Sequence, residues 1–193
     1  MEREYIEEKT FDKIDFTINP LPGGEYEYCV FKNCDFSNSD LSGRLFMECE
    51  FESCNLSMTK LTNATFRDST FRNCKMLGLH FENCNEFGFS VNFDNCDLNY
   101  SSFYRTKMKK TVFKNLRLQE ADFTECDLSG SVFDGCDLAR AVFKNTIIEK
   151  ADFRTSFNYS IDPEANRIRK AKFSLSGIAG LLDKYDIEID IKN

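Results

Sequence analysis

The chain has 193 residues, a net charge of −7 and 41% hydrophobic residues, which is the size and composition of a single folded domain. No apolar run approaches the roughly 18 residues of a membrane-spanning helix, and the first residues lack the apolar core of a secretion signal, so we expect a cytoplasmic protein without a membrane partner. Phenylalanine is unusually common, with 20 residues, and tryptophan is absent.

Residues 1–24 are predicted to form an N-terminal cap and turn. Phe11 and Phe16 are already in phase with the repeat that follows. The run Pro20-Leu21-Pro22-Gly23-Gly24 has the composition of a turn and precedes the regular part of the chain.

Residues 25–160 carry a repeat of five residues. Every fifth residue from Phe31 to Phe81, and again from Phe93 to Phe153, is Phe, Leu, Met or Ile, which makes 24 apolar centres. The position two residues before each centre is Cys, Ser, Thr or Ala in 20 of the 24 repeats. A period of five fits neither an α-helix nor an alternating strand, and a fixed period indicates a repeat architecture.

The spacing predicts a four-sided coil. Residues two apart on an extended chain point the same way, so each repeat sends one small and one large side chain inward and then turns. Gly or Asn often stands two residues after the centre, where a turn needs a positive φ. Four sides make coils of about 20 residues that stack at about 4.8 Å. One face then holds a core ladder of seven residues: Phe31, Phe51, Phe71, Phe93, Phe113, Phe133 and Phe153.

Two irregularities interrupt the pattern. Arg44 occupies an inward position where a small residue is expected, and because a buried unpaired charge is costly we expect a local distortion there. The segment 84–92 contains two extra residues and places Glu86 where a centre belongs. We expect a bulge or bend in which Phe87 or Phe89 takes the place of the centre.

The nine cysteines could suggest a metal site or disulfides. All of them, however, fall on the small inward position: Cys29, Cys34, Cys49, Cys54, Cys74, Cys84, Cys96, Cys126 and Cys136. Zinc ligands are typically spaced CxxC, whereas the closest pairs here are five residues apart. We therefore interpret them as buried free thiols that fill the core, which would suit a reducing compartment.

Residues 161–193 are predicted to cap the C-terminal end of the coil. Ile178, Leu181, Leu182 and Tyr185 have the spacing of one face of a short helix. The alternation over residues 187–191 predicts a strand with one apolar face. This segment could act as a cap alone or also as a dimerisation element, and we favour the homodimer.

The repeats carry a family resemblance. Stretches such as Cys34-Asp35-Phe36-Ser37-Asn38 and Ala121-Asp122-Phe123-Thr124-Glu125 resemble the consensus of the pentapeptide-repeat proteins over about residues 9–173. The resemblance implies an all-β fold, a right-handed quadrilateral β-helix with a short C-terminal helix and strand cap. The Asp162-Pro163 pair followed by Leu181-Leu182 looks like the end of the Qnr branch of quinolone-resistance proteins, related to MfpA, in which this element forms a two-fold dimer.

No pattern for catalysis, a metal or a cofactor is found. The only histidine, His80, directly precedes a centre and is expected to point outward without an orienting partner. No Gly-rich phosphate loop or nucleophile motif occurs. We therefore expect a non-enzymatic protein.

Two functions remain open. The resemblance to Qnr implies a DNA mimic that binds DNA gyrase or topoisomerase IV and modulates quinolone sensitivity, without direct nucleic-acid binding. Residues 1–95 hold 17 acids and 9 bases, whereas residues 96–193 hold 15 and 16, so the acidic excess is confined to the N-terminal half. The alternative is a structural scaffold for an unknown protein partner.

Overall fold

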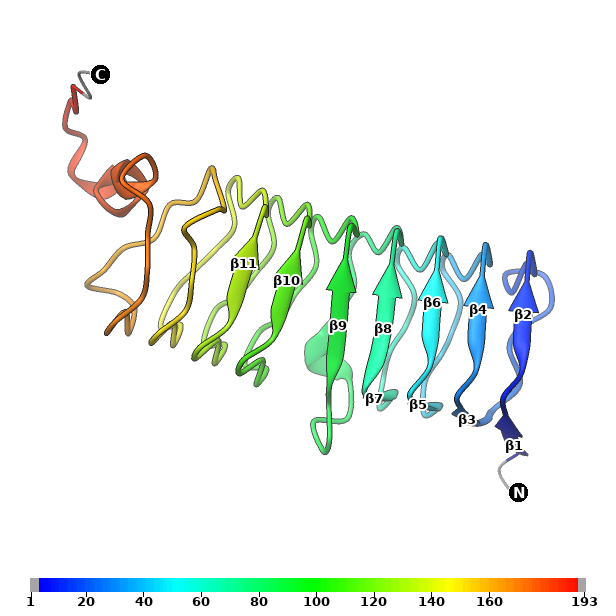
Figure 1. Ribbon diagram of the computed structural model, residues 1–193. Helices are drawn as coiled ribbons and strands as arrows, with labels where there is room; N and C mark the ends of the chain where they lie inside the picture. The colour runs from blue at the N-terminus through cyan, green and yellow to red at the C-terminus, as the bar shows by residue number, and fades with distance from the viewer. Residues whose placement is uncertain (1–3, 191–193) are drawn as a thin grey trace.

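The computed structural model describes residues 4–190, which form a solenoid of stacked coils with its two ends far apart (Figure 1). Parallel pairing joins residues 20 apart, such as Phe31 to Phe51 and Phe46 to Phe66, so each coil contains four five-residue sides. The predicted all-β coil is therefore confirmed. Within residues 4–190 no helix has the length and apolar composition needed to cross a bilayer.

Two sides of the coil form parallel sheets. The first sheet has four strands in the order β1 (Glu4–Glu7), β3 (Gly24–Glu27), β5 (Leu45–Met47) and β7 (Thr65–Arg67). The second has seven strands, which are β2 (Thr10–Asp12), β4 (Val30–Lys32), β6 (Glu50–Glu52), β8 (Ser69–Arg72), β9 (Val91–Asp94), β10 (Val112–Lys114) and β11 (Val132–Asp134). The other two sides are joined by single bridges, for example Asp35 to Asn55 and Asp40 to Lys60.

Apolar centres fill the inside of the coil. All seven phenylalanines of the core ladder are at least 98% buried, and successive rings stack face to face. The ring centroids of Phe31 and Phe51 lie 4.7 Å apart and those of Phe113 and Phe133 4.5 Å apart, close to the spacing of adjacent strands. Rings on adjacent sides meet edge to face, as in Phe31 and Phe36 at 5.7 Å. The interior is thus a closely packed aromatic and aliphatic core.

The small inward residues do more than fill space. The thiol of Cys136 donates to the carbonyl of Phe113 at 3.3 Å, and the hydroxyl of Ser131 donates to the carbonyl of Met108 at 2.6 Å. Each of these donors lies 23 residues after its acceptor, in the next coil. Cysteine, serine and threonine therefore link successive coils from inside the core. All nine cysteines are free thiols; eight are buried, and Cys84 is half-buried.

The corners of the coil lie two residues after each centre. Most of these residues have positive φ, and they include Asn33 at +52°, Glu48 at +49° and Lys150 at +60° as well as the glycines. Glu, Lys and Arg thus share a conformation that the sequence pattern suggested for Gly and Asn. Their side chains point to solvent, and the ladder hydrogen bonds of the next coil fix their backbone, as in the Glu48 amide bond to the Arg67 carbonyl at 2.8 Å.

The segment after β8 departs from the coil. A 3-10 turn, η1 (Phe81–Asn83), is followed by a loop over residues 84–90, and β9 then pairs with β8 so that Phe71 lies opposite Phe93. The extra residues therefore bulge outward without adding a side. Phe89 packs against the core, whereas Phe87 is 75% exposed at the loop. Of the two alternatives, Phe89 thus takes the inward place.

Arg44 causes no buried charge. Its guanidinium is half-buried but satisfied, because it donates to the backbone carbonyls of Leu21, Pro22 and Ser42. The Nε atom is 3.1 Å from both the Leu21 and the Pro22 oxygens. The arginine thereby holds the turn that precedes the regular coils. In place of the expected distortion, Arg44 forms hydrogen bonds with the N-terminal cap.

The C-terminal cap consists of two 3-10 turns, η2 (Ile178–Leu181) and η3 (Asp183–Tyr185). The amide of Ile161 donates to the carbonyl of Gly180 at 2.8 Å, which docks the turns onto the last coil. The strand predicted over residues 187–191 is wrong for residues 187–190, which have no regular structure and are exposed, and residue 191 lies outside the described residues. Among residues 4–190 no strand pairs with them.

Candidate functional site

No constellation for catalysis or metal binding is seen among residues 4–190. No group of three or more His, Cys, Asp or Glu side chains there could hold a metal ion. His80 is exposed, as predicted, but it does have a partner, since its Nδ1 lies 2.9 Å from Oε1 of Glu82. Burial raises the pKa of Cys49, Cys126 and Cys136 to about 12, so these thiols stay protonated and inert at neutral pH.

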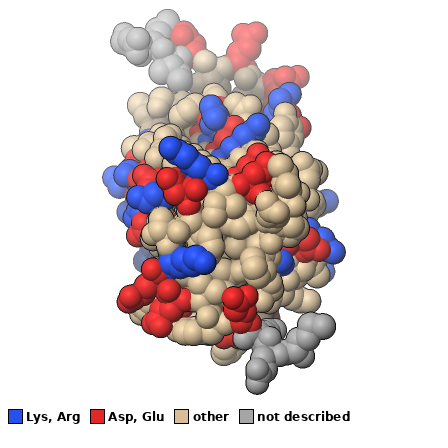
Figure 2. All heavy atoms as spheres, turned by 90° about the vertical axis from the view of Figure 1, so that its right-hand side faces the viewer, with Lys and Arg blue, Asp and Glu red and all other residues tan. Residues whose placement is uncertain are grey.

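One corner of the solenoid is acidic in its N-terminal half. We call it the charged corner; it precedes the strands of the seven-stranded sheet. The positions of successive coils stack there because the amide of Glu8 bonds the carbonyl of Glu27 and that of Tyr28 bonds the carbonyl of Met47. Its acidic half consists of Glu7, Glu8, Glu27, Glu48 and Asp68. Acidic groups gather along the lower edge of the N-terminal end (Figure 2).

The acids of this half are not neutralised by lysine or arginine within the described part of the chain. Glu27, Glu48 and Asp68 accept hydrogen bonds from hydroxyl groups instead. The phenol of Tyr5 donates to Oε2 of Glu27 at 2.5 Å, and that of Tyr28 donates to Oε1 of Glu48 at 3.0 Å. Donation to Glu27 raises the pKa of Tyr5 to about 12, so the phenol keeps its proton at neutral pH. The acidic half is therefore available to a positively charged partner.

The same corner is basic in its C-terminal half. Beyond the loop 84–90 its positions are occupied by Lys110, Gly130, Lys150 and Lys170, with Arg169 beside the last. The amide of Lys110 bonds the carbonyl of Ser129 and that of Lys150 bonds the carbonyl of Arg169, which continues the stack. These four bases are exposed and have no acidic partner within residues 4–190. The charged corner thus changes sign at the loop.

Charges elsewhere on the surface are mostly paired between coils. Lys32 binds Glu52 at 3.2 Å, Lys114 binds Asp94 at 3.0 Å, and Arg140 binds Glu120 at 2.7 Å. In each of these pairs the partners are 20 residues apart and neutralise each other across neighbouring coils. In the acidic half of the charged corner, by contrast, no such ion pair forms within the described part of the chain. Sequence reasoning located the acidic excess but missed its alignment, which only the 20-residue stacking reveals.

The C-terminal cap exposes apolar side chains. Of the four predicted cap residues, Leu181 packs against the core, Leu182 is half-buried, and Ile178 and Tyr185 are 42% and 51% exposed. The hydroxyl of Tyr185 donates to Glu164 at 3.1 Å, while Lys184 bridges Asp162 at 2.8 Å and Glu164 at 2.6 Å. Further exposed apolar residues surround them, namely Leu175, Ile187 and Ile189. The cap therefore presents an apolar end surface.

Comparison with solved structures supports the fold. A trypsin-treated variant of QnrB1, described as a plasmid-mediated fluoroquinolone resistance protein, superposes with a TM-score of 0.75 at 20% identity and covers 97% of this chain and 92% of that chain. A second trypsin-treated variant gives a TM-score of 0.63 at 21% identity, with 97% and 98% covered. At this identity the likeness shows the fold alone. No curated protein sequence matches the chain.

The family is shown by the repeat itself. A family model described as the pentapeptide repeat region matches residues 25–86 and 79–153, which together make up most of the chain. The matched part contains the regular coils with their small inward residues and apolar centres. The chain therefore belongs to the pentapeptide repeat family.

Proposed function

We propose that this protein is a non-enzymatic interaction protein, and that the acidic half of its charged corner binds a basic surface of a protein that normally holds DNA. The observation that carries the proposal is the row of unneutralised acids from Glu8 to Asp68 on four stacked coils. The partner to test is a type II topoisomerase, DNA gyrase or topoisomerase IV, with modulation of quinolone sensitivity as the outcome. The similarity of the fold to QnrB1, a fluoroquinolone resistance protein, supports this choice.

The charge density sets the extent of the mimicry. Four coils span about 14 Å between the first and the last strand. Duplex DNA of that length carries about eight phosphate charges, at one per roughly 1.7 Å. The acidic half places five carboxylates over the same length, and Arg67 stands in the row that holds Glu7 and Glu27, which leaves a net of four negative charges. It therefore imitates a short stretch of DNA at reduced density, and its contribution to association is electrostatic steering as much as affinity.

The basic half favours the second candidate function. A mimic of DNA along its whole length would be negative throughout, whereas Lys110, Lys150 and Lys170 reverse the sign beyond the loop. A structural scaffold that holds a protein partner of mixed polarity would use both halves. The two functions thus differ in whether the bases are needed for binding.

A supercoiling assay with purified gyrase tests the first function. The acid variant Glu8→Gln, Glu48→Gln, Asp68→Asn removes three charges from the surface and leaves the core intact. The matched base variant is Lys110→Gln, Lys150→Gln, Lys170→Gln. If the acids bind gyrase, the wild type inhibits supercoiling or shifts quinolone sensitivity at micromolar concentration. The acid variant then needs about tenfold more protein because three attractive charges are lost, whereas the base variant acts at least as well as the wild type.

The opposite results are equally informative. Unchanged supercoiling and unchanged quinolone sensitivity with the wild type, repeated with topoisomerase IV, would remove the DNA-mimic function and leave the scaffold. An effect that the base variant loses and the acid variant keeps would assign binding to the other half of the corner. Circular dichroism of both variants controls for the fold.

We further infer a homodimer formed through the C-terminal cap and a cytoplasmic location. The exposed side chains of Leu175, Ile178 and Tyr185 offer an apolar surface for a second copy of the chain. The eight buried free thiols fit a reducing compartment. The dimer would join two solenoids end to end, with both basic halves near the centre and both acidic halves at the outer ends.

A further inference from the structure

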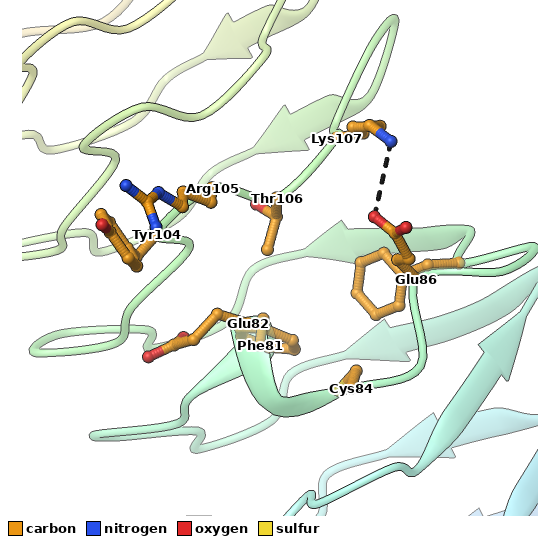
Figure 3. A pocket seen from close by; sticks show the side chains of 9 residues that line it. Phe81, Glu82, Cys84, Glu86, Tyr104, Arg105, Thr106 and Lys107 are labelled. Atoms are coloured by element: carbon orange, nitrogen blue, oxygen red, sulfur yellow. Dashed lines mark hydrogen bonds and ion pairs between the residues drawn. The ribbon is translucent and has the colours of Figure 1, made fainter.

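A pocket of about 400 Å³ opens beside the loop 84–90. One wall comes from η1 and the loop, with Phe81, Glu82, Cys84, Glu86 and Phe89. The facing wall is the turn of the next coil, from Tyr104 to Lys107 (Figure 3). Its volume lies within the range of small-molecule sites, and it is separate from the acidic and basic halves of the charged corner.

The pocket exists because the loop bonds to only one of its neighbouring coils. The amide of Asn85 donates to the carbonyl of Ala64 at 2.8 Å, and that of Ser90 donates to the carbonyl of Phe66 at 2.9 Å, both in the preceding coil. Within the described chain, no backbone hydrogen bond joins residues 84–90 to the following coil. The link on that side is the ion pair of Lys107 with Glu86, at 3.4 Å. The loop therefore leaves a gap where a regular side would close the stack.

The base of the pocket is apolar and chemically inert. The rings of Phe81 and Phe89 meet edge to face with centroids 6.2 Å apart, and Phe81 is 98% buried. Burial and the nearby charge of Glu82 raise the pKa of Cys84 to about 12. The thiol therefore stays protonated at neutral pH and serves as apolar wall rather than as a nucleophile. Such a base suits the hydrocarbon body of a ligand.

One carboxylate in the wall has unused capacity to accept hydrogen bonds. Arg105 is engaged by Glu125 at 2.7 Å, and Lys107 is engaged by Glu86. Oε1 of Glu82 meets His80, but its Oε2 is buried and has no hydrogen-bond partner. A buried acceptor without a donor is costly, so a donor brought by a ligand is favourable there. Glu82 extends from η1 toward the side of the pocket where Tyr104 lies (Figure 3).

We propose that this pocket binds a small amphipathic cation, an apolar body carrying a primary ammonium group. The body lies on Phe81 and Phe89, and the ammonium donates to the carboxylate of Glu82. The positive charge is selected because Glu82 is the acid of the pocket that no lysine or arginine neutralises within residues 4–190. A neutral ligand leaves that carboxylate uncompensated, and an anion is repelled by it.

Three probes of the same shape test the proposal: phenethylammonium, 2-phenylethanol and phenylacetate. Each is titrated into the full ¹⁵N-labelled chain while its amide chemical shifts are followed. We expect saturable shifts confined to residues 81–89 and 104–107. Phenethylammonium should bind about tenfold more tightly than the alcohol, as a charge-assisted hydrogen bond implies, and phenylacetate should bind most weakly.

Two variants and a control assign the binding to its groups. Glu82→Gln keeps the shape and should reduce phenethylammonium affinity to that of the alcohol. Thr106→Leu fills the pocket and should abolish binding of both, and it remains informative should Glu82→Gln unfold. The control Glu50→Gln, on the seven-stranded sheet, should bind like the wild type. Equal binding of cation and alcohol by the wild type, or no saturable shift up to tens of millimolar, overturns the proposal.

Discussion

At the residue scale, the inward cysteines, serines and threonines combine two tasks that usually fall to different side chains. They are small enough to leave room for the apolar centre two residues later, and they donate to a carbonyl of the preceding coil. Cys54 donates to Phe31, and Thr59 donates to Phe36 at 2.8 Å. Alanine, which is also common at this position, fills the space but supplies no donor. The choice among the four residues therefore changes the links between coils without changing the shape of the core.

The buried thiols make stability sensitive to alkali. Burial raises the pKa of Cys136 from its ordinary value of 9.0 to about 12, so the folded state keeps a proton that the unfolded state loses above pH 9. Its stabilising contribution is complete below pH 9 and is lost as the pH rises toward 12. Cys136→Ser keeps the donor and removes the titration. Relative to the variant, the wild type should lose about 1.4 kcal/mol of unfolding free energy per pH unit between pH 9 and 11.

Urea unfolding followed by circular dichroism at pH 7.5, 9, 10 and 11 measures this difference. At pH 7.5 the two proteins should agree within about 1 kcal/mol, because Ser131 shows that a serine fits the equivalent position. A constant difference at all four pH values would show that Cys136 does not titrate on unfolding.

At the element scale, the loop 84–90 is the feature that makes one coil differ from the others. It carries the exposed Phe87, whose ring lies 5.7 Å from the guanidinium of Arg67, and it separates the acidic from the basic half of the charged corner. It also opens the pocket, because within the described chain residues 84–90 form no backbone hydrogen bond with the following coil. Two added residues thus create both a boundary in the surface charge and a cavity.

Deleting Glu86 and Gly88 should restore a regular coil. In the shortened sequence Phe87 stands two residues after Cys84 instead of three. Cys84 then becomes the small inward residue and Phe87 the centre of an ordinary repeat. We expect the unfolding free energy to stay within about 1 kcal/mol of the wild type or to rise, since a short insertion costs little. The amide of Lys107 should gain a ladder bond, and its hydrogen exchange should slow at least tenfold.

Phe87→Ser is the matched control for this deletion, because it keeps the loop length and removes only the exposed ring. Its exchange at Lys107 should remain that of the wild type. Fast exchange at Lys107 in the deletion variant, with the solenoid otherwise intact, would mean that the extra residues are not what holds the coils apart.

The fold was predictable wherever the five-residue period is unbroken. The inward place of Phe113 or Cys136 follows from position alone, because every coil repeats the same environment. The outcome at Phe87 and Phe89 did not follow, since both rings are equally apolar and only the hydrogen bonds of Asn85 and Ser90 to the preceding coil select Phe89. The strand expected near Ile187 failed for a similar reason: alternation marks an apolar face, but a strand also needs a partner.

At the scale of the whole molecule, the charged corner and the cap impose one geometry on any assembly. The acidic half lies at the N-terminal end and the basic half beside the C-terminal cap. Two copies joined at the cap would bring their basic halves close together. The electrostatic repulsion between these halves would be screened by salt. In the proposed dimer the contact between the two caps would therefore be mainly apolar, and the exposed Leu175, Ile178 and Ile187 offer such a surface.

The dimer is best tested away from the residues that hold the cap in place. Leu181 packs against the core, so changing it would disturb the fold, whereas Leu175 is 77% exposed. Leu175→Asp should give a folded monomer of 22.4 kDa in sedimentation equilibrium, whereas the wild type should have twice that mass. Ile18→Asp is the control, since Ile18 is 73% exposed at the other end, and it should remain a dimer.

Because the dimer opposes two basic halves, dissociation of the wild type should weaken as salt rises from 0.05 to about 0.5 M. A wild type that sediments as a monomer at 100 µM, on the order of ordinary assay concentrations, would leave the cap as a terminus of the solenoid and nothing more.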